Sequence, residues 1–184
     1  MKEQRWKILS SEYLVKAPWA VLRKDSCLMP SGHIVPEYYV LEYPNWVNVV
    51  ALTDKNQIVL VRQYRHGIQK SLLEIPGGMI DEGEDSLAAA KRELLEETGY
   101  KFDSFENICE LFPNPATSNN ITTTYLARGG RKVQEQELDL QEDIEVILAS
   151  PSEVKELLLQ NKFEQALHAA ALFYALLSIG EIRQ

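Results

Sequence analysis

The sequence has no apolar run long enough to cross a membrane. Its most apolar late segment, residues 166–179, is shorter than the ~20 residues that a membrane-spanning helix needs, and it contains His168. The first six residues open no apolar signal stretch. We therefore expect a cytoplasmic protein with no membrane partner, in which residues 166–179 pack as a core helix.

Cysteine and histidine are also scarce. Cys27 and Cys109 have no C-x-x-C spacing, and no pair among the three histidines has the spacing of metal ligands. These patterns argue against a cysteine- or histidine-based zinc site. Two reduced thiols in a cytosolic protein are the simpler interpretation.

Positively charged residues are fewer than negatively charged ones, and the sequence has no run of Lys and Arg. The chain carries 19 Lys and Arg against 27 Asp and Glu, which gives a formal net charge of −8. Nucleic-acid phosphate is repelled by such a field, so we expect no nucleic-acid partner. A small anionic substrate remains compatible with this charge if a cation bridges it to the acidic protein.

What is present predicts a folded chain with a hydrophobic core, because 45% of the 184 residues are apolar and 25% are charged. Strands and helices alternate irregularly, which favours an α/β sandwich with a mixed sheet over a doubly wound parallel sheet. Residue patterns predict strands over 8–15, 19–28, 33–42, 47–52, 58–64, 72–75, 105–112, 122–128 and 144–148, and helices over 87–98, 154–159 and 164–178.

Turn and cap residues set several boundaries. The segments 47–52 and 58–64 flank a polar turn and predict a hairpin, while Pro76-Gly77-Gly78 predicts a turn after a short strand. Asp85 or Ser86 caps the start of the first helix, and Gly99 suits the left-handed residue after its end. Residues 129–141 are polar and predict a mobile loop.

The first predicted helix carries three carboxylates on one face. Glu96 and Glu97 follow Glu93 by three and four residues, so the three side chains share a side of the helix. Hard oxygen ligands in such a group suit magnesium or manganese. Taken alone, the three glutamates would equally suit a solvated acidic face.

The surrounding residues favour the metal interpretation. The segment GMIDEGEDSLAAAKRELLEETGY has a glycine, five residues, a glutamate, seven residues, and then R-E-aliphatic-x-E-E-x-G. With these positions the chain resembles the Nudix hydrolase family, departing only at Tyr100, a packing position where an aliphatic residue is usual. The matching residues are Gly78, Glu84, Arg92, Glu93, Leu94, Glu96, Glu97 and Gly99.

The resemblance implies a Nudix-type α/β/α sandwich with a mixed central sheet and an N-terminal antiparallel β extension. Residues 1–44 would form that extension and a homodimer, and residues 45–184 would form the hydrolase domain. It also implies that Glu93, Glu96, Glu97 and the Gly77 carbonyl bind Mg²⁺, with Mn²⁺ as a substitute. Glu84 would join or orient these ligands, and Arg92 would pair with a glutamate.

Several features resemble ADP-ribose pyrophosphatases and related nucleotide-sugar hydrolases. About 45 strand-like residues precede the hydrolase domain, and Val61-Arg62-Gln63-Tyr64-Arg65 resembles their V-x-Q-Y/F-R segment. Pro115 follows the motif at about the distance where ADP-ribose-type members have a proline. Ala116 and Asn120 depart from the residues that are usual in those members. Substrate contacts would come from Arg62, Arg65, Pro115 and an aromatic face, with Trp46 and Trp19 as candidates.

The implied reaction is cleavage of the diphosphate bond of a nucleoside-diphosphate sugar, with ADP-ribose as the first candidate. Metal-activated water attacks one phosphorus, giving a nucleoside monophosphate and a sugar phosphate. Glu93 and Glu97 act with the metal, and Glu142 is the expected general base, in competition with Asp139, Asp143 and Glu145. The alternatives are GDP-mannose or other nucleotide sugars, nucleoside triphosphates or diadenosine polyphosphates, and a non-catalytic Nudix-like nucleotide sensor.

Overall fold

The computed structural model describes residues 5–182 and divides into two compact units. The N-terminal unit comprises Met1–Pro44 with Phe112–Ile121, and the second unit comprises Asn45–Leu111 with Thr122–Gln184. Residues 45–184 are predicted to form the hydrolase domain, and within this range the structure groups Phe112–Ile121 with the N-terminal unit. The reason is local pairing: the Leu41 N–H donates to Thr117 O at 2.7 Å, and the Tyr38 hydroxyl donates to Ala116 O at 2.6 Å.

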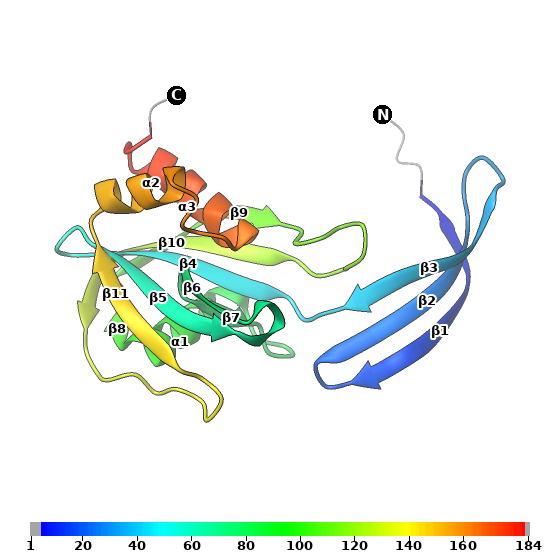
Figure 1. Ribbon diagram of the computed structural model, residues 1–184, viewed down its shortest axis with the longest axis horizontal. Coiled ribbons are helices and arrows are strands. Elements are labelled where there is room, and N and C mark those ends of the chain that lie inside the picture. Colours follow the sequence, from blue (N-terminus) through cyan, green and yellow to red (C-terminus); the bar gives the residue numbers. More distant parts are fainter. Residues whose placement is uncertain (1–4, 183–184) are drawn as a thin grey trace. The chain divides into compact units, whose positions relative to one another are not determined.

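The N-terminal unit is built on an antiparallel sheet of β1 (Lys7–Ala17), β2 (Ala20–Leu28) and β3 (Ile34–Glu42), in the order β1-β2-β3 (Figure 1). Asp25 and Cys27 of β2 are buried, and Asp25 accepts hydrogen bonds from Arg23 Nε at 2.9 Å and Ser11 Oγ at 2.7 Å. The bond from Arg23, more than that from Ser11, lowers the pKa of Asp25. Every residue of β1 is exposed.

A mixed sheet forms the second unit. Its strands are β4 (Trp46–Thr53), β5 (Ile58–Arg65), β6 (Lys70–Glu74), β7 (Gly77–Met79), β8 (Tyr100–Lys101), β9 (Ser104–Leu111), β10 (Thr122–Lys132) and β11 (Ile144–Ala149). The central order is β11-β5-β4-β10-β8, with β6 on β5, β7 on β4 and β9 on β10. The pair β4–β10 is parallel and the other pairs are antiparallel.

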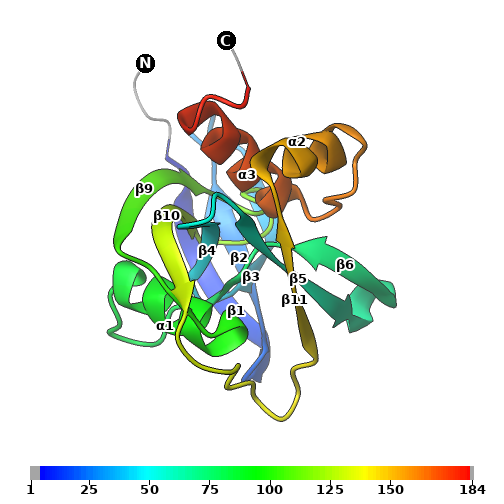
Figure 2. The ribbon, with the colours of Figure 1, turned by 90° about the vertical axis from the view of Figure 1, so that its left-hand side faces the viewer.

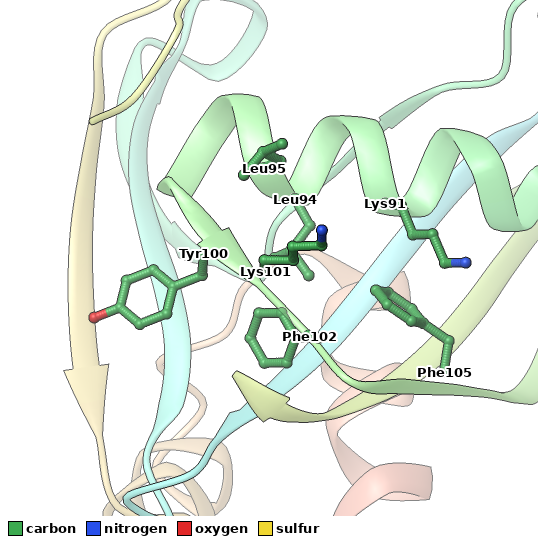
Figure 3. Close-up of a pocket in the computed structure, with 7 residues that line it drawn as sticks. All are labelled: Lys91, Leu94, Leu95, Tyr100, Lys101, Phe102 and Phe105. Atoms are coloured by element: carbon green, nitrogen blue, oxygen red, sulfur yellow. The ribbon is translucent and has the colours of Figure 1, made fainter. Parts of the chain in front are cut away.

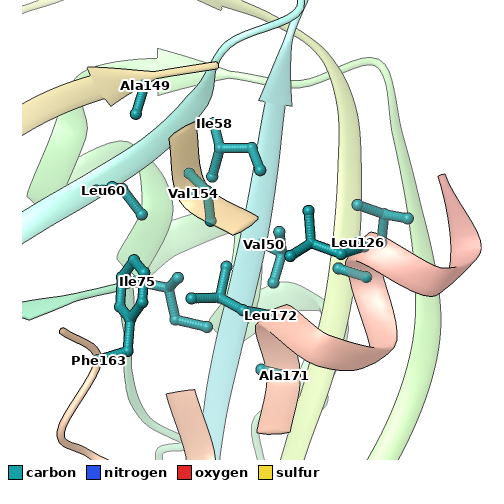
Figure 4. Close-up of a cluster of buried hydrophobic side chains, with 12 residues drawn as sticks. Val50, Ile58, Leu60, Ile75, Leu126, Ala149, Val154, Phe163, Ala171 and Leu172 are labelled. Atoms are coloured by element: carbon teal, nitrogen blue, oxygen red, sulfur yellow. The ribbon is translucent and has the colours of Figure 1, made fainter. Parts of the chain in front are cut away.

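Helices cover both faces of this sheet, as Figure 2 shows. On one face α1 (Ser86–Thr98) buries Ala89, Ala90 and Leu94 against β4 and β10. On the other face α2 (Pro151–Leu159) and α3 (Ala166–Ser178) pack in a second cluster (Figure 4). This arrangement confirms the predicted α/β/α sandwich with a mixed sheet and an N-terminal antiparallel sheet. Among the described residues, no helix is long and apolar enough to span a membrane.

The local predictions that fail concern the strands around β4. The predicted hairpin with β5 is limited to Ala51 opposite Val59 and Leu52 opposite Ile58. Before that point the same edge of β4 pairs with β7, so Gly77 and Gly78 lie in a strand rather than in the predicted turn. β10 also continues to Lys132, into the segment predicted as loop. The exchange of partners matters, because it holds Gly77 and Gly78 beside the sheet centre.

Candidate active site

Helix α1 presents the motif glutamates because both of its ends are capped. The Asp85 carboxylate accepts from the N–H groups of Leu87 at 3.0 Å and Ala88 at 3.2 Å, which satisfies two donors of the first turn. Gly99 ends the helix with φ 72°, a conformation that favours glycine. Since Leu94 is fully buried, the helix is fixed in rotation, and the glutamates point to the side of the Gly77–Met79 strand.

Glu97 is the most enclosed of these acids, with 6% of its surface exposed. Its Oε2 accepts from the Gly77 N–H at 3.0 Å. Burial raises the pKa of Glu97 to about 8, the Gly77 bond opposes this shift, and the charges of Glu93 and Glu142 add to it. A buried carboxylate beside two others calls for a counter-charge, and a divalent cation would provide one.

The carboxylate of Glu93 packs directly on the backbone of Gly78. A β-carbon at Gly78 would overlap the Glu93 carboxylate, so only glycine leaves this space open. Burial raises the pKa of Glu93, hydrogen bonding to Arg92 lowers it, and the charges of Glu96 and Glu142 raise it further. The glycine of the motif therefore provides the room in which a second acid approaches the site.

Arg92 ties the outer acids together. Its Nε and Nη2 donate to the Glu84 carboxylate at 3.0 and 2.9 Å, and Nη2 also donates to Met79 O at 3.1 Å. Its Nη1 donates to Glu93 at 2.8 Å and to Glu96 at 3.3 Å. These acids raise the pKa of Arg92, with Glu84 as the largest contribution. Arg92 thus neutralises part of the cluster and orients it.

The carboxylate oxygens fit a hard divalent cation in their chemistry, but in this structure they do not converge on one position. Within residues 5–182, no group of three or more His, Cys, Asp or Glu side chains has the arrangement of a formed metal site. Glu93 and Glu96 face Arg92, whereas Glu97 faces the Gly77 N–H. A bound cation would compete with the Arg92 guanidinium and the Gly77 N–H for these oxygens, because carboxylate oxygens are ligands that hard divalent cations prefer.

The loop before β11 brings a fourth acid to the cluster. Glu142 is half-buried, accepts from the Asp139 N–H at 3.0 Å, and raises the pKa of both Glu93 and Glu97. The competing acids are placed differently: Asp139 and Asp143 of the loop are exposed, and Glu145 of β11 pairs with Arg62 at 3.4 Å. Glu142 is therefore the loop acid whose charge acts on the buried Glu97 and the half-buried Glu93.

Sequence reasoning missed the residue that holds this loop. Gln136 Nε2 donates to Glu97 O at 2.7 Å and to Ile144 O at 3.0 Å, so it joins the end of α1 to the start of β11. The Glu137 N–H also donates to Glu96 O at 2.9 Å. A glutamine within a polar loop carries no recognisable signal, because only the fold brings these carbonyl groups to it.

The proposed substrate contacts are distributed unevenly. Arg65 forms a bidentate ion pair with the buried Glu74, its Nη2 lying 2.6 Å from Glu74 Oε2, whereas Arg62 is exposed beside Glu145. Trp46 begins β4 opposite Met79 and is partly exposed. Pro115 is exposed in the N-terminal unit, and Trp19 of that unit is 72% exposed.

Contacts on successive residues fix the segment that leads into Gly77. Arg65 binds the carboxylate of Glu74, and His168 Nδ1 accepts from the Ile75 N–H at 3.4 Å. The Val49 N–H donates to Pro76 O at 2.9 Å. Since His168 accepts through Nδ1, its ring is neutral, and burial followed by the charge of Arg65 lowers its pKa to about 3. The three residues that precede Gly77 are thus each fixed by a contact with another part of the second unit.

We expect His168 to make stability depend on acidity. Its folded pKa of about 3 lies below the unfolded value of 6.5, so the unfolded chain binds the extra proton, and stability falls as the pH drops below 6.5. The loss is about 1.4 kcal/mol for each pH unit. In urea titrations between pH 7.5 and 5.5, His168→Asn, which retains an acceptor near Nδ1, should show a smaller loss than wild type. Equal losses in both proteins would contradict this role.

Comparison with known proteins agrees with this geometry. Residues 43–171 match the NUDIX domain, and residues 6–41 match the nucleoside diphosphate sugar hydrolase N-terminal domain. An ADP-ribose pyrophosphatase of Bacillus subtilis is 28% identical over 95% of this chain and 94% of its own length. A methanol dehydrogenase activator of Bacillus methanolicus is 33% identical over 77% of this chain and 76% of its own.

Two further comparisons extend this result. An ADP-ribose pyrophosphatase of Mycobacterium tuberculosis is 37% identical over 72% of this chain and 64% of its own. The crystal structure of an ADP compounds hydrolase matches 99% of this chain and 100% of its own with a TM-score of 0.85, and its 23% identity supports the fold alone. With the domain match and the motif side chains around Gly77 and Gly78, the chain belongs to the Nudix hydrolase family.

Proposed function

We propose that this protein hydrolyses the diphosphate bond of nucleoside-diphosphate sugars, with ADP-ribose as the preferred substrate, in the cytoplasm. The observation that carries the proposal is that Glu97 accepts from the Gly77 N–H and the Glu93 carboxylate lies against Gly78, while the charge of Glu142 acts on both glutamates. The N-terminal domain match and the names of the pyrophosphatase relatives favour nucleotide sugars over nucleoside triphosphates. GDP-mannose and other nucleotide sugars remain the alternatives.

Nudix hydrolases generally use divalent metal ions, and we assign Mg²⁺ to this one, with Mn²⁺ as a substitute. Glu93, Glu96, Glu97 and the Gly77 carbonyl would hold the ion. When bound, the ion offsets the charge of the diphosphate and acidifies a water molecule. The chain's own part is to supply oxygen ligands on a fixed helix and to hold them with Arg92.

The remaining roles follow from position and charge. Glu142 accepts the proton of the attacking water, since it is the loop acid that acts on both Glu93 and Glu97. Arg65 binds Glu74 through Nε and Nη2, and we assign its Nη1 to substrate phosphate. Arg62 adds positive charge and Trp46 contacts the nucleotide, while Pro115 is kept as a proposed substrate contact of the N-terminal unit. The products are a nucleoside monophosphate and a sugar phosphate.

Replacing the proposed base gives a direct test of its role. Glu142→Gln should lower kcat by about 10²-fold or more, because glutamine has the same shape but accepts no proton. The neighbouring exposed acid offers a matched control, and Asp143→Asn should keep kcat within about threefold of wild type. If the Glu142→Gln protein turned over as fast as wild type, the base would have to be another residue.

We also propose that the N-terminal unit joins two copies of the chain into a homodimer. Exposed large apolar side chains gather there on β1 and beside it, as expected of a surface that another chain covers. Light scattering on a sizing column should give twice the 21.0 kDa chain mass, and a monomer would exclude this role. These side chains are Trp6, Ile8, Leu9, Tyr13, Leu14, Val15 and Trp19.

A substrate panel read by mass spectrometry tests the activity as a whole. With Mg²⁺, ADP-ribose should give AMP and ribose 5-phosphate and should exceed GDP-mannose, nucleoside triphosphates and diadenosine polyphosphates in kcat/KM. A chelator should stop the release. Tight nucleotide binding without any metal-dependent release would instead identify a nucleotide sensor.

A further inference from the structure

A separate cavity of about 220 Å³ lies between α1 and the segment that contains β8 and the start of β9 (Figure 3). Lys91, Leu94 and Leu95 supply the helix side of this cavity. These positions are three and four residues apart, so they share a face of α1 that lies opposite the face of the motif glutamates. None of the glutamates assigned to the reaction lines the cavity. It is therefore a different site from the candidate active site.

Aromatic rings build the wall that faces the helix. Phe102 is buried, and its ring lies 6.3 Å from the ring of Phe105 in an edge-to-face arrangement. Tyr100 lies at the other end, 6.4 Å from Phe102. Tyr100 and Phe105 are partly exposed, so with Leu95 opposite their rings offer flat apolar surfaces that suit a planar ligand.

Two lysine side chains also line the cavity. Lys91 Nζ lies 5.6 Å from the centre of the Phe105 ring, and Figure 3 shows Lys101 extending from β8 into the same space. In the part of the chain that the structure describes, other lysines form ion pairs with carboxylates, but Lys91 and Lys101 form none. This is so although acids outnumber bases in the whole sequence, whose net charge is −8. Positive charge without acidic partners beside aromatic rings is complementary to an aromatic anion.

We propose that this cavity binds a nucleoside monophosphate, with its base against the Tyr100 and Phe105 rings and its phosphate on Lys91 and Lys101. The cavity is smaller than the ~300–1,000 Å³ of usual ligand pockets, so it accommodates a base and leaves the phosphate at the mouth. A nucleoside-diphosphate sugar is too large for it. The site stands apart from the proposed hydrolysis, and each can fail without the other.

NMR titration of the full chain in chelator tests the proposal, with AMP, adenosine and inorganic phosphate as probes. AMP should produce saturable shifts of the backbone amides of Leu95, Tyr100 and Lys101. Adenosine and phosphate should each need at least about tenfold higher concentration, since each lacks one half of the recognition. Adenosine binding as tightly as AMP, or AMP shifts confined to Gly78 and Glu93, would overturn the assignment.

Variants separate the lysines from the general charge of the protein. The double variant Lys91→Gln with Lys101→Gln should weaken AMP binding at this site about tenfold, while Lys55→Gln, at an exposed turn elsewhere, should leave it unchanged. Both proteins should melt and hydrolyse ADP-ribose as wild type does. Unchanged AMP shifts in the folded double variant would refute the site.

Discussion

Replacing Glu97 by glutamine should lower metal-dependent kcat by at least about 100-fold while leaving the fold intact. Glutamine keeps an oxygen that can accept from the Gly77 N–H, so the helix keeps its contact with β7. It removes the charge that a cation would use. Steady-state kinetics with ADP-ribose and saturating Mg²⁺ provide the measurement.

Thermal melting supplies the control for this variant. The folded pKa of Glu97, about 8, lies above its ordinary value of 4.5, so its ionisation destabilises the metal-free fold as the pH rises from 4.5 through 8. Metal-free Glu97→Gln at pH 8 should therefore melt at or above the wild-type temperature. Mg²⁺ should raise the Tm of the wild type but much less that of the variant. An unfolded variant would show that the loss of activity has a structural cause.

Substituting Gly78 by alanine should lower kcat about 10- to 100-fold. The added methyl group would occupy the space of the Glu93 carboxylate, which is the mobile end of a side chain and has to move away. The protein should therefore fold normally and lose activity through a displaced acid. Kinetics and the Mg²⁺ concentration at half-maximal rate should both register the change.

Two other glycines calibrate this effect. A β-carbon at Gly77 would overlap the backbone carbonyl of Val47, which cannot move without breaking the sheet, so Gly77→Ala should fold poorly. Gly67 has open space around its β-position, and Gly67→Ala should be neutral in both stability and rate. Wild-type activity in Gly78→Ala would show that Glu93 does not need its present position.

The sequence predicted most of the fold because local signals and burial agree. The Asp85 cap and the left-handed Gly99 mark the two ends of α1 that the structure has. The partner exchange along β4 was not predictable in this way. Its two neighbours on one edge, β5 and β7, are chosen by non-local pairing, which a periodic pattern does not encode.

The candidate site was predictable to the extent that its residues belong to one helix. Spacing alone places Glu93, Glu96 and Glu97 near one another, but their different environments come from the fold: Glu97 is buried on Gly77, whereas Glu96 is half-exposed beside Arg92. The sequence left Glu142 in competition with three other acids. What distinguishes Glu142 is its environment in the fold: it is half-buried and its charge acts on Glu93 and Glu97, whereas the other three acids are exposed.

Manganese binding, followed by electron paramagnetic resonance at pH 7.5, tests most directly whether the helix carboxylates hold the cation. Wild type should bind Mn²⁺, and Glu93→Gln and Glu97→Gln should each weaken binding at least about tenfold. Glu106→Gln, an exposed acid on β9, should bind as wild type does. Wild-type affinity in both Glu93→Gln and Glu97→Gln would contradict the metal site and the hydrolytic mechanism built on it.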